Sequence, residues 1–364
     1  MKKEPVRFGI VGLKRGLCAL SLLEEESVLI TAVCDNNPAT LAAAKETIQS
    51  ELAARGKAQE VRYFDSYEEL LRADVDAVYI ANYATEHVPL VIQALEAGKH
   101  VISEIPTVDT LEEARALKAA VTAHPELKYM AGENCCYWAF IQAWKQMYRD
   151  GKLGQAIYAE AEYLHCGDWR SMKPENYPHD HWRYDHPAIK YLTHSLGPLL
   201  DILDDRCVSV SCMVPDVKYN PYRDKPKTGV ALFKTAKGAV IRILIGFDAY
   251  VGMDHNYYVM GTRGTLETDK TAPLETASSY AKFADVPGTY YNKLEIPLHL
   301  SFPGESTAGH GGADHKMLMD FIRCIQEDTP PPLDVDDGIR MSLPGIIAHE
   351  SSLRGGELMM IPEI

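Results

Sequence analysis

The first 130 residues alternate short apolar segments with segments of helical periodicity. The apolar segments are "VRFGIVG", "VLITAVCD", "DAVYIAN", "HVISE" and "KYMAGEN". A strand that is apolar on both faces and is followed by a helix is typical of βαβ units, in which helices cover both sides of a parallel sheet. We expect helices from about Arg15 and at 38–55, 87–97 and 110–122. The pattern predicts a doubly wound nucleotide-binding α/β domain over residues 1–132.

The pattern changes after about residue 155. Segments such as "IYAEAEY", "VSVSCMV" and "GVALFKT" alternate apolar and polar residues, and two helical segments close the chain. Alternation of this kind indicates an antiparallel sheet with one covered face. We predict an α+β domain with an open antiparallel sheet over residues 133–364. Because "AVIRILIGF" carries apolar residues on both faces, we expect a homodimer or homotetramer that buries the open face.

Charge and composition narrow the class of partner. The chain has 37 Lys and Arg against 51 Asp and Glu, a net charge of −14, which argues against nucleic acid or an anionic membrane as partner. No apolar run approaches membrane-spanning length, and "MKKEPVRFGIVGL" has no signal-peptide pattern. The eight cysteines show no C-x-x-C spacing. These features predict a cytoplasmic protein that binds a small molecule.

The segment "FGIVGLKRGL" stands where a dinucleotide-binding turn is expected. Gly12 fits the tight-turn position, whereas Lys14 replaces the second glycine of the usual motif and Leu17 the third. At the start of a helix, Lys14 and Arg15 could bind pyrophosphate oxygens. Asp35 ends the second strand, where an acid accepts hydrogen bonds from ribose hydroxyls and repels a 2′-phosphate. The turn therefore predicts binding of NAD in preference to NADP.

Several stretches together resemble one known family. "VRFGIVGL", "DAVYIANYATEHVPLVIQALEAGKHVISEIP" and "GTRGTLE" are similar to the Gfo/Idh/MocA family of NAD(P)-dependent sugar oxidoreductases, and the likeness covers nearly the whole chain. It implies a Rossmann domain joined to an open antiparallel α+β domain. Most members carry a lysine between the glutamate and proline of "EIP", where it helps to place or protonate the reacting hydroxyl. This chain has Ile105 there, between Glu104 and Pro106.

A narrower resemblance accounts for the missing lysine. "EIP", "GENCCY", "YLTHSLGPL" and "GHGGADHKMLMDFIRCIQEDTPPPLDVDD" resemble the NAD-dependent glycoside hydrolases related to α-N-acetylgalactosaminidases. The resemblance implies transient oxidation: NAD⁺ takes hydride from sugar carbon 3, the carbon 2 proton becomes acidic, the aglycone is eliminated, water adds and hydride returns. Two alternatives remain open. One is an NAD-dependent sugar dehydrogenase without the usual lysine, and the other is a non-catalytic NAD- or sugar-binding protein.

Candidates for proton transfer lie in "AIKYLTHSLGPLLDIL", which we predict to be helical. Tyr191 and His194 are three residues apart and would share a helix face. An imidazole titrates near neutral pH, and a phenol beside a cation can act as a base. His194 also matches the H-x-x-G-P pattern of the relatives. We therefore predict that His194 and Tyr191 are catalytic.

The resemblance also suggests residues that contact cofactor or substrate. Glu104 would orient the nicotinamide or its ribose, and Ile105 would provide a dry wall. The further candidates for cofactor contacts are Asn82, His87, Asn134, Trp169 and Arg170. The candidates for substrate contacts are His181, Arg183, Tyr184, Lys190 and His310. The spacing of His179, His181 and His186 fits no standard zinc pattern, and we expect no metal.

Overall fold

The computed structural model describes residues 4–165, 184, 186–221, 226–247, 253–273, 276–305, 307 and 309–364. The chain divides into two compact units. Unit 1 comprises Met1–Gly132 and Ala308–Ile339, and unit 2 comprises Glu133–Thr307 and Arg340–Ile364. The sequence predicts a boundary after residue 132, and the structure has one there. Residues 308–339, which we expected in the second domain, return to unit 1.

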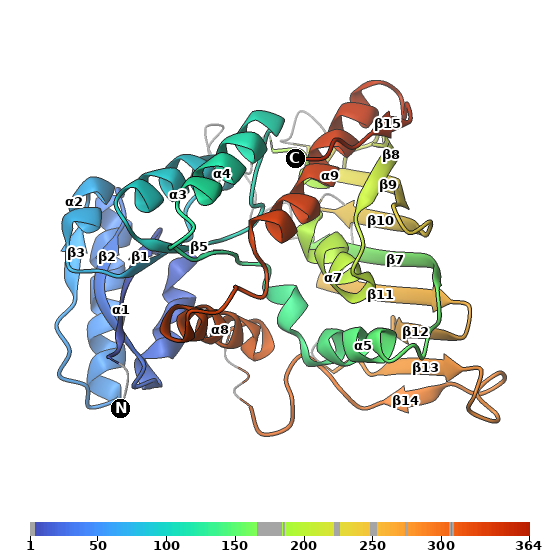
Figure 1. Ribbon diagram of the computed structural model, residues 1–364, viewed down its shortest axis with the longest axis horizontal. Helices are drawn as coiled ribbons and strands as arrows, with labels where there is room; N and C mark the ends of the chain where they lie inside the picture. Colours follow the sequence, from blue (N-terminus) through green and yellow to red (C-terminus); the bar gives the residue numbers. More distant parts are fainter. Residues whose placement is uncertain are drawn as a thin grey trace. The chain divides into compact units, whose positions relative to one another are not determined.

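Unit 1 contains a six-stranded parallel sheet with the strand order β3-β2-β1-β4-β5-β6 (Figure 1). The five predicted apolar segments all form strands of this sheet, and β3 is a short addition at its edge. The strands are β1 (Val6–Val11), β2 (Val28–Cys34), β3 (Arg62–Phe64), β4 (Ala77–Ile80), β5 (His100–Ser103) and β6 (Tyr129–Ala131).

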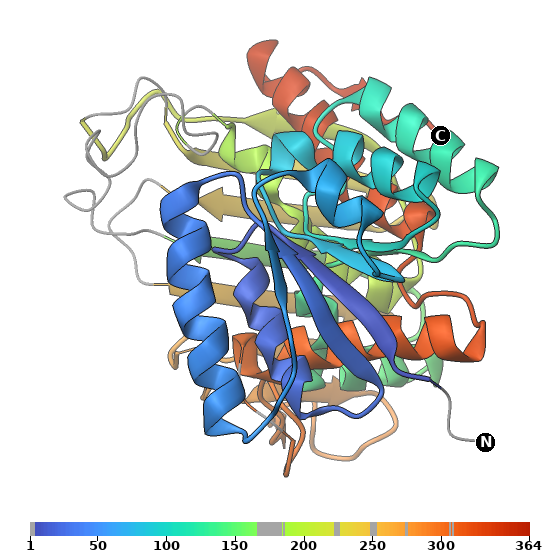
Figure 2. The same ribbon diagram turned by 90° about the vertical axis from the view of Figure 1, so that its left-hand side faces the viewer.

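Helices cover both faces of this sheet, as predicted. Helices α3 and α4 pack together on one face, whereas η1 and α8 pack together on the other (Figures 1 and 2). The segment expected to be helical from about Arg15 forms the 3₁₀ helix η1. The helical elements are η1 (Gly16–Glu24), α1 (Pro38–Ala54), α2 (Tyr67–Arg72), η2 (Ala84–Glu86), α3 (His87–Glu96), α4 (Leu111–Ala123), η6 (His310–Gly312) and α8 (Ala313–Glu327).

Local signals explain where two of these helices begin. The Asn37 side chain accepts hydrogen bonds from the N–H groups of the first turn of α1, and Pro38 occupies its first position. Thr110 and Glu113 form a reciprocal capping box at the start of α4. Both helices begin within one residue of the predicted starts.

Unit 2 contains a nine-stranded sheet with the order β14-β13-β12-β11-β7-β10-β9-β8-β15. Its strands pair antiparallel, except that the central β7 and β10 run parallel. The strands are β7 (Ala156–His165), β8 (Cys207–Met213), β9 (Thr228–Thr235), β10 (Val240–Gly246), β11 (Met253–Gly261), β12 (Gly264–Thr268), β13 (Ser279–Phe283), β14 (Leu294–Ile296) and β15 (Met359–Met360).

One face of this sheet is covered by helices and the other is open. Helix α7 packs on β7 and β11, and α5 packs on α7. On β9, Ala231 and Phe233 are buried, whereas Val230 and Leu232 on the opposite face are 38% and 51% exposed. The helical elements are η3 (Asn134–Tyr137), α5 (Ala139–Arg149), η5 (Ala188–Tyr191), α7 (Thr193–Leu203) and α9 (Val335–Leu353), the last of which spans the boundary between the units.

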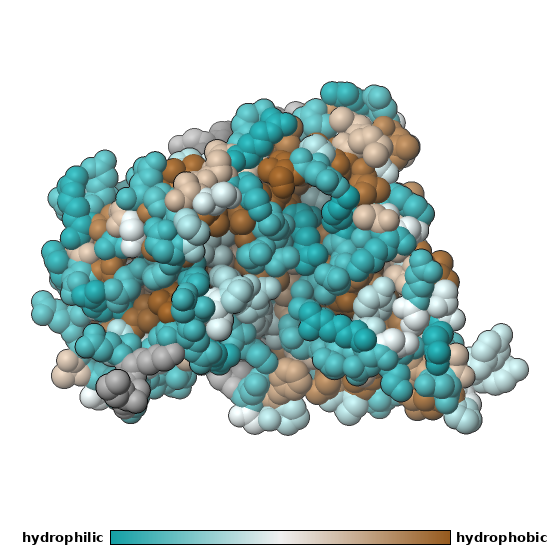
Figure 3. Space-filling model, in the orientation of Figure 1, coloured by the Kyte–Doolittle hydropathy of each residue, from teal (hydrophilic) through white to brown (hydrophobic). Residues whose placement is uncertain are grey.

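The surface of unit 2 is hydrophobic at one end. Figure 3 shows apolar side chains gathered at the upper right, over β15 and the end of α9. Leu353, Leu358 and Met360 are exposed there. In the part of the chain that the structure describes, no helix is both long enough and apolar enough to cross a membrane.

Candidate functional site

The turn between β1 and η1 has the close backbone approach that a dinucleotide-binding turn needs. Gly12 has a φ of +86°, which favours glycine. A Cβ atom added to Gly12 would lie 2.6 Å from the carbonyl carbon of Ala81 and from the nitrogen of Asn82. Only glycine therefore fits where β1 ends beside β4.

Asp35 is held next to this turn at the end of β2. Its Oδ2 accepts a hydrogen bond of 2.9 Å from the Leu13 N–H, and its Oδ1 accepts one of 2.9 Å from the Asn37 N–H. Lys14 is exposed, and none of the described residues forms a hydrogen bond or ion pair with its side chain. The turn thus presents a fixed carboxylate and an available ammonium group.

The guanidinium group of Arg15 contacts two carboxylates. Its Nη1 and Nη2 form hydrogen bonds of 2.8 and 2.7 Å with the two oxygens of Asp314, and its Nε lies 2.8 Å from Oε1 of Glu104. Oε1 of Glu104 also accepts a hydrogen bond from the Tyr79 hydroxyl. The sequence suggests Arg15 as a pyrophosphate ligand, but these contacts leave Lys14 as the available cation of the turn.

Asp314 anchors the network and was not among the predicted site residues. Its side chain is 2% exposed, and His310 Nδ1 lies 2.9 Å from Oδ2. Burial alone would raise the pKa of Asp314, but hydrogen bonds from Arg15 and His310 outweigh it and hold this pKa well below its ordinary value. His310, a predicted substrate contact, belongs to unit 1 and is paired with this carboxylate.

Asn82 and His87 lie where β4 ends. The buried ring of His87 contacts two backbone oxygens, with Nδ1 2.9 Å from the Pro106 oxygen and Nε2 3.4 Å from that of Asn82. Burial lowers the pKa of His87, which favours the neutral ring. His87 therefore connects two loops of unit 1.

Asn82 provides a test of whether this edge fits a dinucleotide. Its Nδ2 donates to Glu86, whereas its buried Oδ1 has no hydrogen-bond partner among the described residues. A buried acceptor without a donor is rare in folded proteins and suits a ligand hydroxyl or amide. Together with the Gly12 approach and the fixed Asp35, it shows that the residues present fit NAD.

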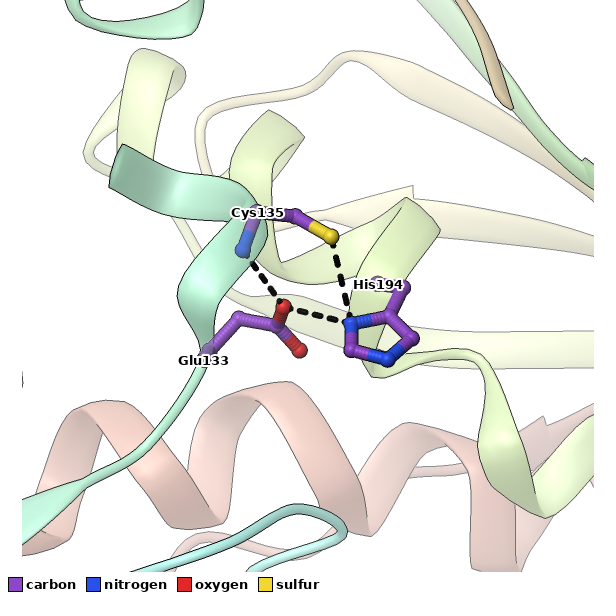
Figure 4. A group of neighbouring side chains, drawn as sticks. All are labelled: Glu133, Cys135 and His194. Carbon is purple, nitrogen blue, oxygen red and sulfur yellow. Dashed lines mark hydrogen bonds and ion pairs between the residues drawn. The ribbon is translucent and has the colours of Figure 1, made fainter. Parts of the chain in front are cut away.

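A second cluster lies in unit 2 and contains His194 (Figure 4). His194, on α7, has its Nδ1 2.7 Å from Oε1 of Glu133, which follows β6. The Cys135 Sγ lies 3.2 Å from the same Nδ1, and the Cys135 N–H donates to Oε1 of Glu133 at 3.1 Å. Glu133 is fully buried, whereas the His194 side chain is 13% exposed. No hydrogen bond from a described residue engages Nε2 of His194.

Aromatic rings enclose this histidine. The rings of Tyr163 and Tyr191 lie 5.4 and 5.5 Å from the His194 ring, both nearly perpendicular to it, and the His255 ring stacks on Tyr163 at 4.2 Å. The Tyr257 hydroxyl donates to the backbone oxygen of His194, and burial raises the pKa of Tyr257 well above its ordinary value. The imidazole therefore lies among aromatic rings with one carboxylate partner.

The sequence anticipates part of this cluster. Tyr191 and His194 are neighbours as predicted, although Tyr191 ends η5 and His194 lies in α7 instead of on one continuous helix. Glu133 stands at the end of the apolar segment "KYMAGEN", which is predicted to be a strand. Cys135 and Tyr163 had no signal that separates them from ordinary core residues.

The remaining predicted residues fall into two groups. Asn134 and Tyr184 are buried and Lys190 is half-buried, all three in unit 2. Asn134 adjoins the cluster, because its Oδ1 lies 3.5 Å from the Cys135 Sγ. The predicted residues outside the described part of the chain are Trp169, Arg170, His181 and Arg183.

Comparison with known families gives three matches along the chain. Residues 6–132 match the oxidoreductase family with an NAD-binding Rossmann fold, Gfo/Idh/MocA. Residues 141–267 match a Gfo/Idh/MocA C-terminal domain, and residues 227–364 match the C-terminal domain of glycosyl hydrolase 109.

Similar proteins cover the chain almost completely. A glycosyl hydrolase family 109 protein of Solibacter usitatus is 28% identical over 98% of this chain and 88% of its own length. An alpha-N-acetylgalactosaminidase of Shewanella oneidensis is 28% identical over 96% of this chain and 83% of its own.

Solved structures show the same fold. A levoglucosan dehydrogenase in complex with NADH and levoglucosan superimposes with a TM-score of 0.82 at 18% identity, over 99% of this chain and 100% of its own. A scyllo-inositol dehydrogenase from Lactobacillus casei with bound NAD(H) and scyllo-inositol has a TM-score of 0.78 at 18% identity, over 98% and 99%. The predicted fold class is thereby confirmed. The chain is an NAD-dependent enzyme of the Gfo/Idh/MocA oxidoreductase family, with a C-terminal domain of the glycosyl hydrolase 109 type.

Proposed function

We propose that the enzyme is a glycoside hydrolase that oxidises its sugar transiently and releases the aglycone without net redox change. When bound, NAD⁺ accepts a hydride from sugar carbon 3 and later returns it. The carbonyl at carbon 3 acidifies the carbon 2 proton, whose removal allows elimination of the aglycone. Water then adds at carbon 1, and a proton returns to carbon 2.

The contact between Glu133 and His194 carries this proposal. Oε1 of Glu133 lies 2.7 Å from Nδ1 of His194 and accepts a hydrogen bond from it in the tautomer that has its proton on Nδ1. That tautomer leaves Nε2 with a free lone pair, and 13% of the His194 side chain is exposed. A base for the carbon 2 proton needs such a ring, positioned by a carboxylate and with one nitrogen able to accept a proton.

Two further features support hydrolysis over simple dehydrogenation. A relative named glycosyl hydrolase family 109 protein and another named alpha-N-acetylgalactosaminidase match the chain over nearly all of its length. Ile105, 4% exposed, stands where a lysine would otherwise place or protonate a reacting hydroxyl. The proton transfers in unit 2 are then assigned to His194, with Tyr191 as the second group.

For the cofactor, we assign the pyrophosphate to Lys14 and the Gly12 turn, and the adenosine ribose to Asp35. Glu104 shares its Oε1 with Arg15 and Tyr79, whereas no described residue bonds its Oε2. We assign Oε2 to the nicotinamide ribose. The seven described cysteines are free thiols, which supports a reducing compartment such as the cytoplasm.

The test uses nitrophenyl glycosides with the full-length enzyme in heavy water. We expect aglycone release with only catalytic NAD⁺, no accumulation of NADH, and deuterium at carbon 2 of the released sugar. His194→Ala is expected to lower kcat by roughly 10²-fold or more while NAD binding stays unchanged. Glu133→Gln is expected to lower kcat with little effect on KM, because it positions the ring.

His124→Ala is the matched control, since His124 lies at the end of α4 and, among the residues that the structure describes, its side chain pairs only with Glu126 across 3.6 Å. Its kcat should equal that of the wild type. A rise of absorbance at 340 nm that matches substrate consumption would instead establish a sugar dehydrogenase. Binding of NAD without turnover of any glycoside or sugar would establish a binding protein.

A further inference from the structure

A carboxylate, a thiol and an imidazole converge in unit 2 (Figure 4). The ligand atoms of Glu133, Cys135 and His194 all lie within 4.8 Å of one another. Within the described residues, this is the one group of three such side chains that could hold a metal ion. Nitrogen, sulfur and oxygen donors in one buried cluster suit a borderline-soft divalent cation, of which Zn²⁺ is the main example.

A second observation is an unsatisfied atom in the cluster. Oε2 of Glu133 is buried and has no hydrogen-bond partner among the described residues. A buried carboxylate oxygen without a partner costs free energy, because it loses its hydration and gains nothing in return. A bound cation would satisfy it.

The two donor spacings from Nδ1 of His194 are slightly shorter than those of a zinc site. Nδ1 of His194 lies 2.7 Å from Oε1 of Glu133 and 3.2 Å from Sγ of Cys135. Tetrahedral zinc with ordinary bond lengths separates such donors by about 3.3–3.6 Å. Outward movements on the order of half an ångström would admit the ion, and side-chain rotation can supply them.

We propose that Glu133, Cys135 and His194 form a binding site for a divalent cation of the zinc class. The ion replaces the hydrogen bond between His194 and Glu133 and takes the Cys135 side chain as a thiolate. Binding releases the thiol proton to water, while the imidazole stays neutral because its proton moves from Nδ1 to Nε2. Three protein ligands leave a fourth tetrahedral position, which we assign to a water molecule.

The site implies a cation that acts as an inhibitor. A metal ion bound to Nδ1 of His194 and to Glu133 would break the hydrogen bond between them. Nε2 would then lose the free lone pair with which it accepts a proton. This consequence rests on the proposed function, but binding of the cation does not.

The test measures binding directly, with Co²⁺ as a spectroscopic probe on metal-free, full-length enzyme. We expect one Co²⁺ per chain, a thiolate-to-cobalt charge-transfer band, the intense visible bands of tetrahedral cobalt, and displacement of all of these by Zn²⁺. Cys135→Ser should abolish the charge-transfer band and weaken Co²⁺ binding at least tenfold. His194→Ala should also weaken it.

Cys136→Ser is the matched control, because Cys136 is the neighbouring buried cysteine and lies outside the cluster. It should keep the charge-transfer band. NAD binding and circular dichroism establish that each variant is folded, and Glu133→Gln provides a third variant that should weaken binding. Absence of the band in the wild type, or its persistence in Cys135→Ser, would overturn the proposal whether or not the enzyme hydrolyses glycosides.

Discussion

Arg15 and Asp314 form a bidentate ion pair although they are 299 residues apart in the chain: Nη1 donates to Oδ2 at 2.8 Å and Nη2 to Oδ1 at 2.7 Å. The pair fixes the start of η1 to the first turn of α8, inside unit 1. Arg15 also contacts Glu104, the first residue of "EIP". The buried carboxylate of Asp314 therefore positions the arginine that binds this strand end.

Replacing this carboxylate should destabilise unit 1. Asp314→Asn would leave Arg15, whose side chain is 29% exposed, with half of its charge compensation removed. Removal of one partner of a buried ion pair costs about 3 kcal/mol. NAD stabilises the unit that binds it, so added NAD identifies the urea transition of unit 1 by raising its midpoint. We expect Asp314→Asn to lower the midpoint of this transition.

Glu68→Gln is the control for this variant. Glu68 pairs with Arg72 on the surface of α2, where both side chains are more than 70% exposed. Exposed pairs contribute about 0.5 kcal/mol or less, so the midpoint should barely change. An equal loss in the two variants would contradict the stabilising role of Asp314.

The same pair should make stability depend on acid pH. The pKa of Asp314 is lowered in the folded state, so its contribution is fully present above the unfolded value of about 3.9 and is lost as the pH falls below it. The difference in unfolding free energy between wild type and Asp314→Asn should be constant between about pH 7 and pH 5 and should shrink below about pH 4. Urea unfolding at several pH values measures it, and a constant difference down to about pH 3 would contradict the assignment.

Substitution of Gly12 is expected to cause both backbone strain and a steric clash, whereas substitution of Gly98 causes strain alone. Gly12 and Gly98 both have positive φ values, +86° and +72°, but a Cβ atom on Gly98 meets nothing within 4 Å. Gly98→Ala should therefore cost only the backbone strain, about 1–2 kcal/mol. Gly12→Ala should cost more and should weaken NAD binding, because the new methyl group meets the backbone of Ala81 and Asn82. Thermal unfolding and NAD titration measure both, and equal effects would argue against a close approach at Gly12.

Asp35 should set the preference between the two nicotinamide cofactors. Its carboxylate is fixed by two backbone N–H groups, and a fixed negative charge repels a 2′-phosphate. We expect NAD to bind more tightly than NADP, and Asp35→Ser to reduce the ratio of their dissociation constants by roughly tenfold, or about 1.4 kcal/mol. Fluorescence titration gives the ratio, and Glu46→Ala on the exposed side of α1 should leave it unchanged. A wild type that prefers NADP would reject the role of Asp35.

Local sequence determines most of the parallel sheet, and long-range contacts determine the rest. The apolar segments of unit 1 form the predicted strands because a strand buried on both faces must be apolar throughout. Strand β3 is only three residues long, with Arg62 exposed, and gives no such signal. The parallel pairing of β7 with β10 and the return of residues 308–339 to unit 1 depend on contacts between distant segments, which no local pattern reports.

The site shows the same limit. His194 follows from its motif, and Glu133 stands at a recognisable strand end, but their contact joins residues 61 positions apart. Sequence reasoning assigned Arg15 to the pyrophosphate because a cation at a helix start suits an anion. The sequence does not show that Asp314 of α8, 299 residues away, binds the guanidinium group of Arg15.

The open face of the unit 2 sheet combines exposed apolar side chains with paired charges. On this face Leu232 of β9 lies opposite Arg242 of β10, which in turn lies opposite Glu160 of β7. Arg242 forms ion pairs of 3.3 and 3.2 Å with Glu160 and Glu162, so the charges on this part of the face are compensated. Exposed apolar side chains beside compensated charges are suited to a second copy of the chain, and we expect a dimer or tetramer.

Leu232→Glu should dissociate this assembly, because the new carboxylate would add a third negative charge to Glu160 and Glu162 around Arg242 and would lose its hydration against the partner, which costs several kcal/mol. Light scattering at micromolar concentration should give a multiple of 40.5 kDa for the wild type and a mass near 40.5 kDa for the variant. Val217→Glu, at an 81% exposed position in the loop after β8, should keep the wild-type mass. A monomeric wild type would refute the assembly, and a variant that stays oligomeric would place the interface on another surface, such as the exposed apolar end formed by α9 and β15.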